Sequence, residues 1–253
     1  MMTTDQGGLR GITEWLANVK LEYVIGAIIV LFIIRLLLAN NKTPAGRFTS
    51  ETVESLCIAI ALVFLVIRPF VVQAFYIPSG SMLPGLQLED HILVNKMIYR
   101  FEEPKIGDVV VFKCPDYAEP SDPGVAMEVR SLSAKPAQLK EFVSTQHFNP
   151  DDVKDYIKRV EGLPGDVLQV KNGALYRNGQ KVNEPYIKQD DERFAYIDGE
   201  FGPLKVPPHE LFMMGDNRNN SNDCRFWGPL DRDRVVGKAW VRFYPGNRLG
   251  LIR

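Results

Sequence analysis

The chain has 253 residues, which is enough for one sizeable domain with additional segments. Its formal net charge is −1 at pH 7, so it carries no overall positive field that would recruit nucleic acid. Three cysteines are too few for a disulfide scaffold, and the three histidines share no metal-ligand spacing, so we expect no metal and no other cofactor. Cys114 and Cys224 could pair in an oxidising compartment, but the sequence does not fix the distance between them.

Two apolar runs near the N-terminus predict two transmembrane helices. The first extends from Tyr23 to about Leu38, and at a rise of about 1.5 Å per residue it nearly spans a hydrocarbon core of about 30 Å. The second extends from Ser55 to Val72, where Pro69 should kink or end the helix. A pair of buried core helices is the alternative. We therefore interpret residues 1–74 as a membrane anchor.

The polar segment between the two runs predicts the orientation of the chain in the membrane. Lys42 and Arg47, together with Arg35, mark this loop as cytoplasmic by the positive-inside rule, although basic residues before the first run make the bias slight. The N-terminus and residues 75–253 would then both lie on the extracytoplasmic side.

From Glu89 onward the pattern changes to short strands. The segments HILVNK, DVVVFK, YIKRVEG and KAWVRFY are rich in β-branched and aromatic residues and are bounded by turn formers. The segment VLQVKNGALYRNGQKV contains two Asn-Gly pairs, which favour type I′ turns and predict a three-stranded meander. A helix is possible around residues 136–146, and residues 116–152 are interpreted as a long loop or insertion of unknown role.

The segment FYIPSGSMLPG, from Phe75 to Gly85, holds two serines between two prolines. Gly80 permits a backbone conformation that strains other residues, so the turn could present the Ser81 hydroxyl as a nucleophile if a base removes its proton. The Ser79 hydroxyl and the Ser81 backbone N–H could then face a developing oxyanion. An ordinary turn is the alternative.

Lys158 is the candidate base. On a strand it shares a face with Tyr156 and Val160, whereas Ile157 and Arg159 point to the other face. Apolar neighbours disfavour the charged form, and reaching pH 7 requires the lysine pKa to fall by roughly three units from about 10.4. The alternative is an exposed strand lysine whose amine reaches water.

The polar segment MGDNRNNSNDCRFWGPL, from Met214 to Leu230, is the third candidate region. Its short polar side chains can bond to neighbouring backbone and hold a loop rigid, whereas Trp227 is interpreted as a core residue. Such a loop could support a catalytic site or be only an elaborate turn.

These three segments, in this order and after two apolar runs, resemble bacterial type I signal peptidases. PSGSM, YIKRVEGLPGD and GDNRNNSNDCRFWG resemble the serine, lysine and C-terminal boxes of that family, and GDVVVFKCP resembles a further family strand. The resemblance covers most of the chain from Phe75 to Tyr244. It implies a mainly β fold of antiparallel sheets with a partly barrel-like catalytic core, held by two N-terminal transmembrane helices. Residues 75–253 would form the catalytic domain.

The resemblance also implies a role for each residue of the site. Ser81 would be the nucleophile and Lys158 the general base and later the general acid. Ser79 would contribute to the oxyanion hole, Ser221 would orient the lysine amine, and Asp223 and Arg225 would form a supporting pair. The substrate pockets would be lined by Phe75, Ile77, Pro78, Met82, Tyr156 and Ile157. Two positions depart from the family pattern, Asn219 in place of aspartate and Cys224 in place of serine.

The implied function is that of a membrane-bound serine endopeptidase that removes signal peptides from secreted preproteins after small residues. Its partners would be preproteins and the lipid bilayer, without nucleic acid, and its location the bacterial inner (cytoplasmic) membrane, as a multi-pass protein with a periplasmic catalytic domain. The sequence does not predict the oligomeric state. The alternatives are another Ser/Lys protease, such as a self-cleaving regulator, and a non-catalytic membrane-anchored β module that binds exported proteins.

Overall fold

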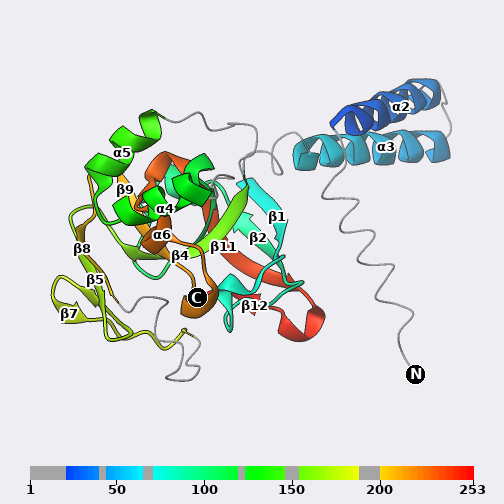
Figure 1. Cartoon of the computed structure of the whole chain (residues 1–253). Helices are drawn as coiled ribbons and strands as arrows, with labels where there is room; N and C mark the ends of the chain where they lie inside the picture. The colour runs from blue at the N-terminus through cyan, green and yellow to red at the C-terminus, as the bar shows by residue number, and fades with distance from the viewer. Residues whose placement is uncertain (1–20, 40–43, 65–70, 119–122, 146–153, 188–199) are drawn as a thin grey trace. The chain divides into compact units, whose positions relative to one another are not determined.

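A computed structural model describes residues 21–39, 44–64, 71–118, 123–145, 154–187 and 200–253 of the chain. The chain divides into two compact units, Met1–Ala74 and Phe75–Arg253 (Figure 1). The first is helical, and the second contains nearly all of the β-structure.

The helical unit consists of α2 (Leu21–Ala39) and α3 (Pro44–Leu62), which pack against each other. An ion pair joins them, with Arg35 Nη2 lying 2.9 Å from Glu54 Oε2. Helix α3 corrects the predicted bounds of the second span: it begins in the segment expected to be a polar loop, where Pro44 suits a first helical position, and it ends before Val72, which starts strand β1. Across the described segments, the helices lack the combination of length and apolarity needed to cross a membrane.

The second unit is built on an eight-stranded sheet of order β1-β2-β11-β3-β4-β9-β10, with β12 paired to β11. Each pairing with an assigned register is antiparallel, and irregularities in β11 and β4 bend the sheet into a half-barrel. The prediction of a mainly β, antiparallel fold is therefore confirmed. The strands are β1 (Val72–Tyr76), β2 (His91–Asn95), β3 (Val109–Lys113), β4 (Asp155–Gly162), β9 (Glu210–Met214), β10 (Leu230–Asp231), β11 (Val235–Tyr244) and β12 (Gly250–Leu251).

A second sheet has four strands in the order β7-β6-β5-β8. Its strands are β5 (Val167–Lys171), β6 (Ala174–Arg177), β7 (Gln180–Lys181) and β8 (Phe201–Lys205). Asn172-Gly173 and Asn178-Gly179 connect the first three strands, and all four residues have positive φ, as a type I′ turn requires. The predicted meander is confirmed.

The insertion at 116–152 is helical in the part that the structure describes, which corrects its interpretation as a loop. Helix α5 (Pro136–Ser144) was expected, whereas α4 (Pro123–Leu132) was missed. Both helices begin at a proline, a residue that favours the first helical turn but also gives a segment the composition of a loop. Helix α4 packs against α6 (Cys224–Trp227), and α4, α5 and α6 lie together in Figure 1.

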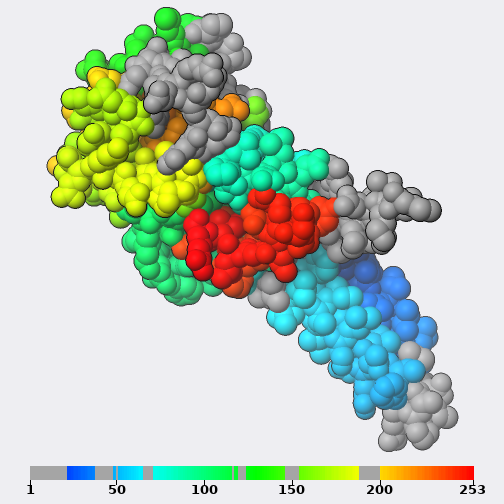
Figure 2. Space-filling view, turned by 90° about the horizontal axis from the view of Figure 1, so that it is seen from below, coloured from blue at the N-terminus to red at the C-terminus, as the bar shows by residue number. Residues whose placement is uncertain are grey.

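Six short 3-10 helices lie between these elements in the described part of the chain. They are η2 (Gly80–Met82), η3 (Ile98–Arg100), η4 (Asp116–Ala118), η7 (Arg218–Asn220), η8 (Arg232–Arg234) and η9 (Gly246–Arg248). In Figure 2 the C-terminal residues (red) lie at the surface beside residues coloured turquoise. Two hydrogen bonds of 3.0 Å from Arg248 to the buried Asp90 carboxylate fix this contact.

The first sheet separates two hydrophobic clusters, and strand β4 contributes to both. Val160 and the partly buried Tyr156 belong to the larger cluster, whereas Ile157 belongs to the smaller one with Ile77 and Met82. The side chains of β4 therefore alternate between the two faces as the sequence predicts. This alternation determines which neighbours surround each polar side chain of the strand.

Candidate active site

The serine segment lies in η2 and is held by the loop that follows β9. Asn217 donates from its backbone N–H to the Ser81 carbonyl oxygen (3.0 Å) and from its side-chain Nδ2 to the Gly80 carbonyl oxygen (2.9 Å). Gly215 packs so tightly against Ser81 that a Cβ there would lie 2.6 Å from the Ser81 carbonyl oxygen. Only glycine fits at position 215, and the close approach holds the serine in place.

Lys158 lies on β4, opposite Val110 of β3, and meets the serine directly. Its Nζ is 2.8 Å from Ser81 Oγ, and its side chain is buried, with 3% of the residue exposed. Burial lowers the pKa of Lys158 to about 8, because the charged amine loses its hydration, while the Asp223 carboxylate opposes the shift. The Tyr156 ring lies 5.3 Å from Nζ and forms part of this dry environment.

The other two predicted serines lie on either side of this pair. Ser79 is exposed, and its Oγ lies 3.5 Å from Ser81 Oγ. Ser221 is buried, and its Cβ and Oγ are the atoms that a Cβ at Gly215 would meet first. The Ser221 side chain helps to lower the pKa of Asp223, and no hydrogen bond from Ser221 Oγ to the lysine amine is found among the described residues.

Asp223 and Arg225 form a buried ion pair behind the serine. Arg225 Nε and Nη2 donate to the two Asp223 carboxylate oxygens at 2.7 and 2.8 Å, and the Gly215 N–H donates to Asp223 at 3.0 Å. Burial disfavours the charged carboxylate, but Arg225 and the bond from Gly215 outweigh it, so the pKa of Asp223 lies below its usual value. The pair therefore holds the glycine that packs against Ser81.

The sequence of the chain is similar to those of known peptidases. A family model described as signal peptidase, peptidase S26, matches residues 49–244. The chain is 38% identical over 212 residues to signal peptidase I of Leptolyngbya laminosa, covering 84% of this chain and 88% of that protein. It is also 32% identical to signal peptidase I S of Bacillus subtilis strain 168, over 205 residues that cover 79% and 91% of the two chains.

The chain belongs to the signal peptidase family, peptidase S26. The resemblance drawn from the three sequence boxes is confirmed, and as a member of this family the protein is a serine peptidase, a hydrolase of peptide bonds. A third relative, signal peptidase I of Mycobacterium tuberculosis strain H37Rv, is 32% identical over 236 residues that cover 85% of this chain and 79% of the relative.

The expected pocket residues of this signal peptidase family member fall into two groups. Ile77, Met82 and Ile157 are buried in the smaller hydrophobic cluster, with Phe75 partly buried against it. The remaining two face other surroundings: Pro78 is exposed in the serine segment and Tyr156 lies beside Lys158. Their contact with substrate stays a prediction.

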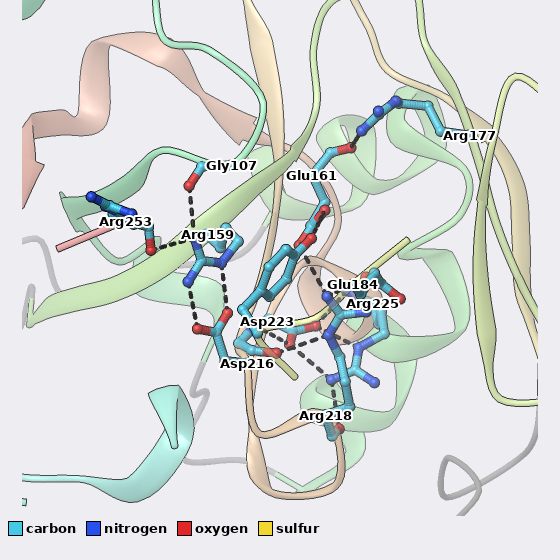
Figure 3. A network of polar contacts seen from close by, with 12 residues as sticks. Gly107, Arg159, Glu161, Arg177, Glu184, Asp216, Arg218, Asp223, Arg225 and Arg253 are labelled. Atoms are coloured by element: carbon cyan, nitrogen blue, oxygen red, sulfur yellow. Dashed lines mark hydrogen bonds and ion pairs between the residues drawn. The ribbon is translucent and has the colours of Figure 1, made fainter. Parts of the chain in front are cut away.

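Sequence reasoning missed two buried ion-pair groups of the site (Figure 3). Arg159 makes two hydrogen bonds to Asp216, at 2.8 and 2.6 Å, and Arg218 pairs with Glu161 at 2.9 Å. All four belong to the lysine and C-terminal boxes, so the motifs contained the residues. The pairing itself is a tertiary contact that no local pattern encodes.

One group of residues in the described part of the chain could hold a metal ion. His209, Asp231 and Asp233 are exposed, and one ligand atom from each lies within 4.8 Å of the others. The histidine spacing did not suggest this group because its aspartates come from a different turn. Cys114 and Cys224 are both free and buried, and Cys224 Sγ accepts a hydrogen bond from the Met213 N–H at 3.0 Å.

Proposed function

We propose that this protein removes signal peptides from secreted preproteins, cutting after small residues, with Ser81 as nucleophile and Lys158 as general base. The observation that carries the proposal is the 2.8 Å contact between Ser81 Oγ and the buried amine of Lys158. A serine hydroxyl is a weak nucleophile until a neighbouring base accepts its proton. A lysine with a pKa of about 8 is partly neutral near physiological pH and can act as that base.

The residues support a two-step acyl transfer. The neutral Lys158 amine takes the Ser81 proton as Oγ bonds to the scissile carbonyl carbon, and the Ser79 hydroxyl and Ser81 N–H stabilise the oxyanion. The resulting ammonium gives its proton to the leaving amine as the C–N bond breaks. Lys158 then takes a proton from water, the hydroxide attacks the acyl-enzyme, and the proton returns to Ser81 as the ester bond breaks.

The supporting residues fit fixed positions around this chemistry. Asp223 and Arg225 hold Gly215 against Ser81, and no step requires either of them to change its charge. In this proposal Ser221 fills the space beside Gly215 and could orient the lysine amine only after a rearrangement. The pockets for small substrate residues would be bounded by the six side chains predicted from the sequence.

We also propose that the helical unit associates with a lipid bilayer, so that the catalytic unit works at the extracytoplasmic face of the bacterial inner membrane. The support is the exposed apolar surface of α2, where Phe32, Leu36 and Leu37 are each at least half exposed. Fractionation of cells expressing the full chain tests this. Recovery in the membrane pellet is expected, and recovery in the soluble fraction would contradict it.

Incubation with a preprotein that carries alanine at the first and third positions before the cut tests the reaction. We expect a single cleavage, identified by the masses of the two products, and no cleavage by Ser81→Ala. Ser131→Ala, an exposed serine on α4, is the matched control and should cleave normally. Binding of the preprotein without any cleavage by the wild type would instead favour the non-catalytic module.

A further inference from the structure

Glu161 is a buried carboxylate that the proposed reaction does not use. It lies on β4, on the same strand as Lys158, and is fully buried. Arg218 Nη2 donates to Glu161 Oε1 at 2.9 Å, and the Tyr186 hydroxyl lies 2.9 and 3.1 Å from the two carboxylate oxygens (Figure 3). A charge removed from water in this way is costly, so its place in the structure requires an explanation.

Arg218 connects this carboxylate to the backbone that holds the nucleophile. Its Nε donates to the Gly215 carbonyl oxygen at 2.9 Å, and Gly215 packs against Ser81 so closely that a Cβ there would lie 2.6 Å from the Ser81 carbonyl oxygen. Arg225 Nη2 in turn donates to the Arg218 carbonyl oxygen at 2.8 Å. A displacement of the Arg218 guanidinium would therefore be transmitted to Ser81 through one glycine.

We propose that Glu161 is a positioning residue for the peptidase reaction, whose carboxylate fixes Arg218 and, through it, the Gly215 backbone that packs against Ser81. The inference rests on the proposed Ser81 chemistry. Glu161 touches neither substrate nor the reacting atoms, so its effect falls on the rate of the chemical step rather than on substrate binding.

The surroundings of Glu161 make this positioning dependent on pH. Burial raises the pKa of Glu161 to about 7, the Arg218 guanidinium opposes the shift, and the Glu184 carboxylate adds to it. Glu184 also pairs with Arg218, at 2.6 Å, and Arg159 is a further cation that acts on Glu161. The Arg177 guanidinium donates to the Glu161 carbonyl oxygen at 3.2 Å. As the pH falls below about 7, Glu161 binds a proton and its attraction for Arg218 weakens.

Glu161→Gln is the decisive variant, because glutamine has nearly the same shape but no charge. We expect kcat to fall about tenfold at pH 8 with KM changed by less than about twofold, since only positioning is lost. In the wild type, the acid limb of kcat/KM should contain this loss near pH 7 in addition to the lysine ionisation. In Glu161→Gln only the lysine ionisation should remain.

Thermal stability separates positioning from a merely structural role. The folded-state pKa of Glu161 lies above its unfolded value, so its ionisation works against folding as the pH rises from about 4.5 to about 7. Glu161→Gln should therefore melt at pH 8 no lower than the wild type while being less active. Glu103→Gln, which removes an exposed carboxylate paired with Arg232, is the matched control and should leave kcat unchanged, with at most a small change in melting temperature.

Glu184→Gln provides an independent arm. Removing the Glu184 charge lowers the pKa of Glu161, so the loss assigned to Glu161 should move to lower pH. An unchanged kcat and pH profile in Glu161→Gln, or an unmoved acid limb in Glu184→Gln, would overturn the inference. A wild type that does not cleave preprotein would instead overturn the proposed function.

Discussion

Two buried groups of side chains in the second unit, Phe75–Arg253, carry positive charge in different surroundings. In the first group, the guanidiniums of Arg159, Arg218 and Arg225 are buried, and each is paired with a carboxylate. The second group is the Ser81–Lys158 pair. The Lys158 amine is buried just as deeply, yet the ion pairs found among the described residues do not include it.

The difference shows how one fold keeps some charges permanent and makes another one switchable. A carboxylate partner compensates the desolvation of a guanidinium, so the three arginines keep their charges. The Arg159 and Arg225 pairs act as fixed supports, whereas Glu161, the partner of Arg218, can bind a proton near pH 7. The Lys158 amine contacts the Ser81 hydroxyl and lies 5.3 Å from the centre of the Tyr156 ring, and burial lowers its pKa to about 8. The amine without an ion-pair partner is therefore a base that can accept a proton near neutral pH.

The largest expected effect comes from removing either member of the Ser81–Lys158 pair. Ser81→Ala and Lys158→Met should each lower kcat for preprotein cleavage by at least about 10³-fold, because the nucleophile or its base is lost. Lys113→Met, on the neighbouring strand and half exposed, should cleave normally. Cleavage at the wild-type rate by Ser81→Ala or Lys158→Met would show that Ser81 and Lys158 are not the catalytic pair.

Lys158→Met also tests whether the charged Lys158 amine destabilises the folded protein because no carboxylate is paired with it. The folded-state pKa lies below the unfolded value of 10.5, so below about pH 8 the folded protein carries a buried ammonium that destabilises it. Replacing it with an apolar side chain should therefore raise the melting temperature at pH 7, and less so at pH 10. A lower melting temperature at pH 7 would argue that the ammonium is stabilised in the fold.

The sequence predicted the Ser81–Lys158 pair better than the buried ion pairs of the arginines, for a physical reason. Alternation along a strand is a local property, so the side of β4 that carries Lys158 could be predicted from its neighbours. The Asn-Gly turns were predictable in the same way. The contact of Glu161 with Arg218 joins residues 57 positions apart, and its geometry depends on how β4 packs against the loop after β9.

The sequence-based prediction missed helix α4 and placed the bounds of α3 wrongly, for a related reason. In both segments the polar residues and prolines indicate a loop when they are considered alone. In the folded chain α4 instead buries Val129 against the main hydrophobic cluster, and this packing outweighs the local preference.

The second largest effect is expected from breaking one compensated pair. Asp223→Asn leaves the Arg225 guanidinium buried without a full counter-charge, which should lower the free energy of unfolding by about 3–5 kcal/mol. Glu103→Gln, at a pair whose carboxylate is 82% exposed, should cost about 1 kcal/mol or less. Chemical denaturation of both variants measures the contrast, and equal costs would remove the distinction between buried and exposed pairs.

The pH profile of the wild type sharpens the contrast between switchable and fixed charges. Below the lysine pKa of about 8, log(kcat/KM) should rise as Lys158 loses its proton, with the smaller contribution of Glu161 near pH 7, and it should level off above that pKa. The pKa of Asp223 lies below its usual value, so this pair stays ionised across the whole range. A profile that is flat from pH 7 to pH 9 would exclude a titrating lysine base.

The smallest expected effect concerns the insertion at residues 116–152, which contacts Arg225 of a buried ion pair and, among the described residues, not the Ser81–Lys158 pair. Ser133, after α4, is buried, and its Oγ lies 2.9 Å from the Arg225 carbonyl oxygen. Ser133→Ala leaves that oxygen without this donor and should cost about 1 kcal/mol of stability, with a loss of a few-fold in kcat because Arg225 positions Asp223. Ser144→Ala, whose exposed hydroxyl bonds only within α5, should change neither quantity. A loss of stability in Ser133→Ala with unchanged kcat would mean that the insertion supports the fold and not the site, and that the compensated pairs hold Ser81 without help from outside the family boxes.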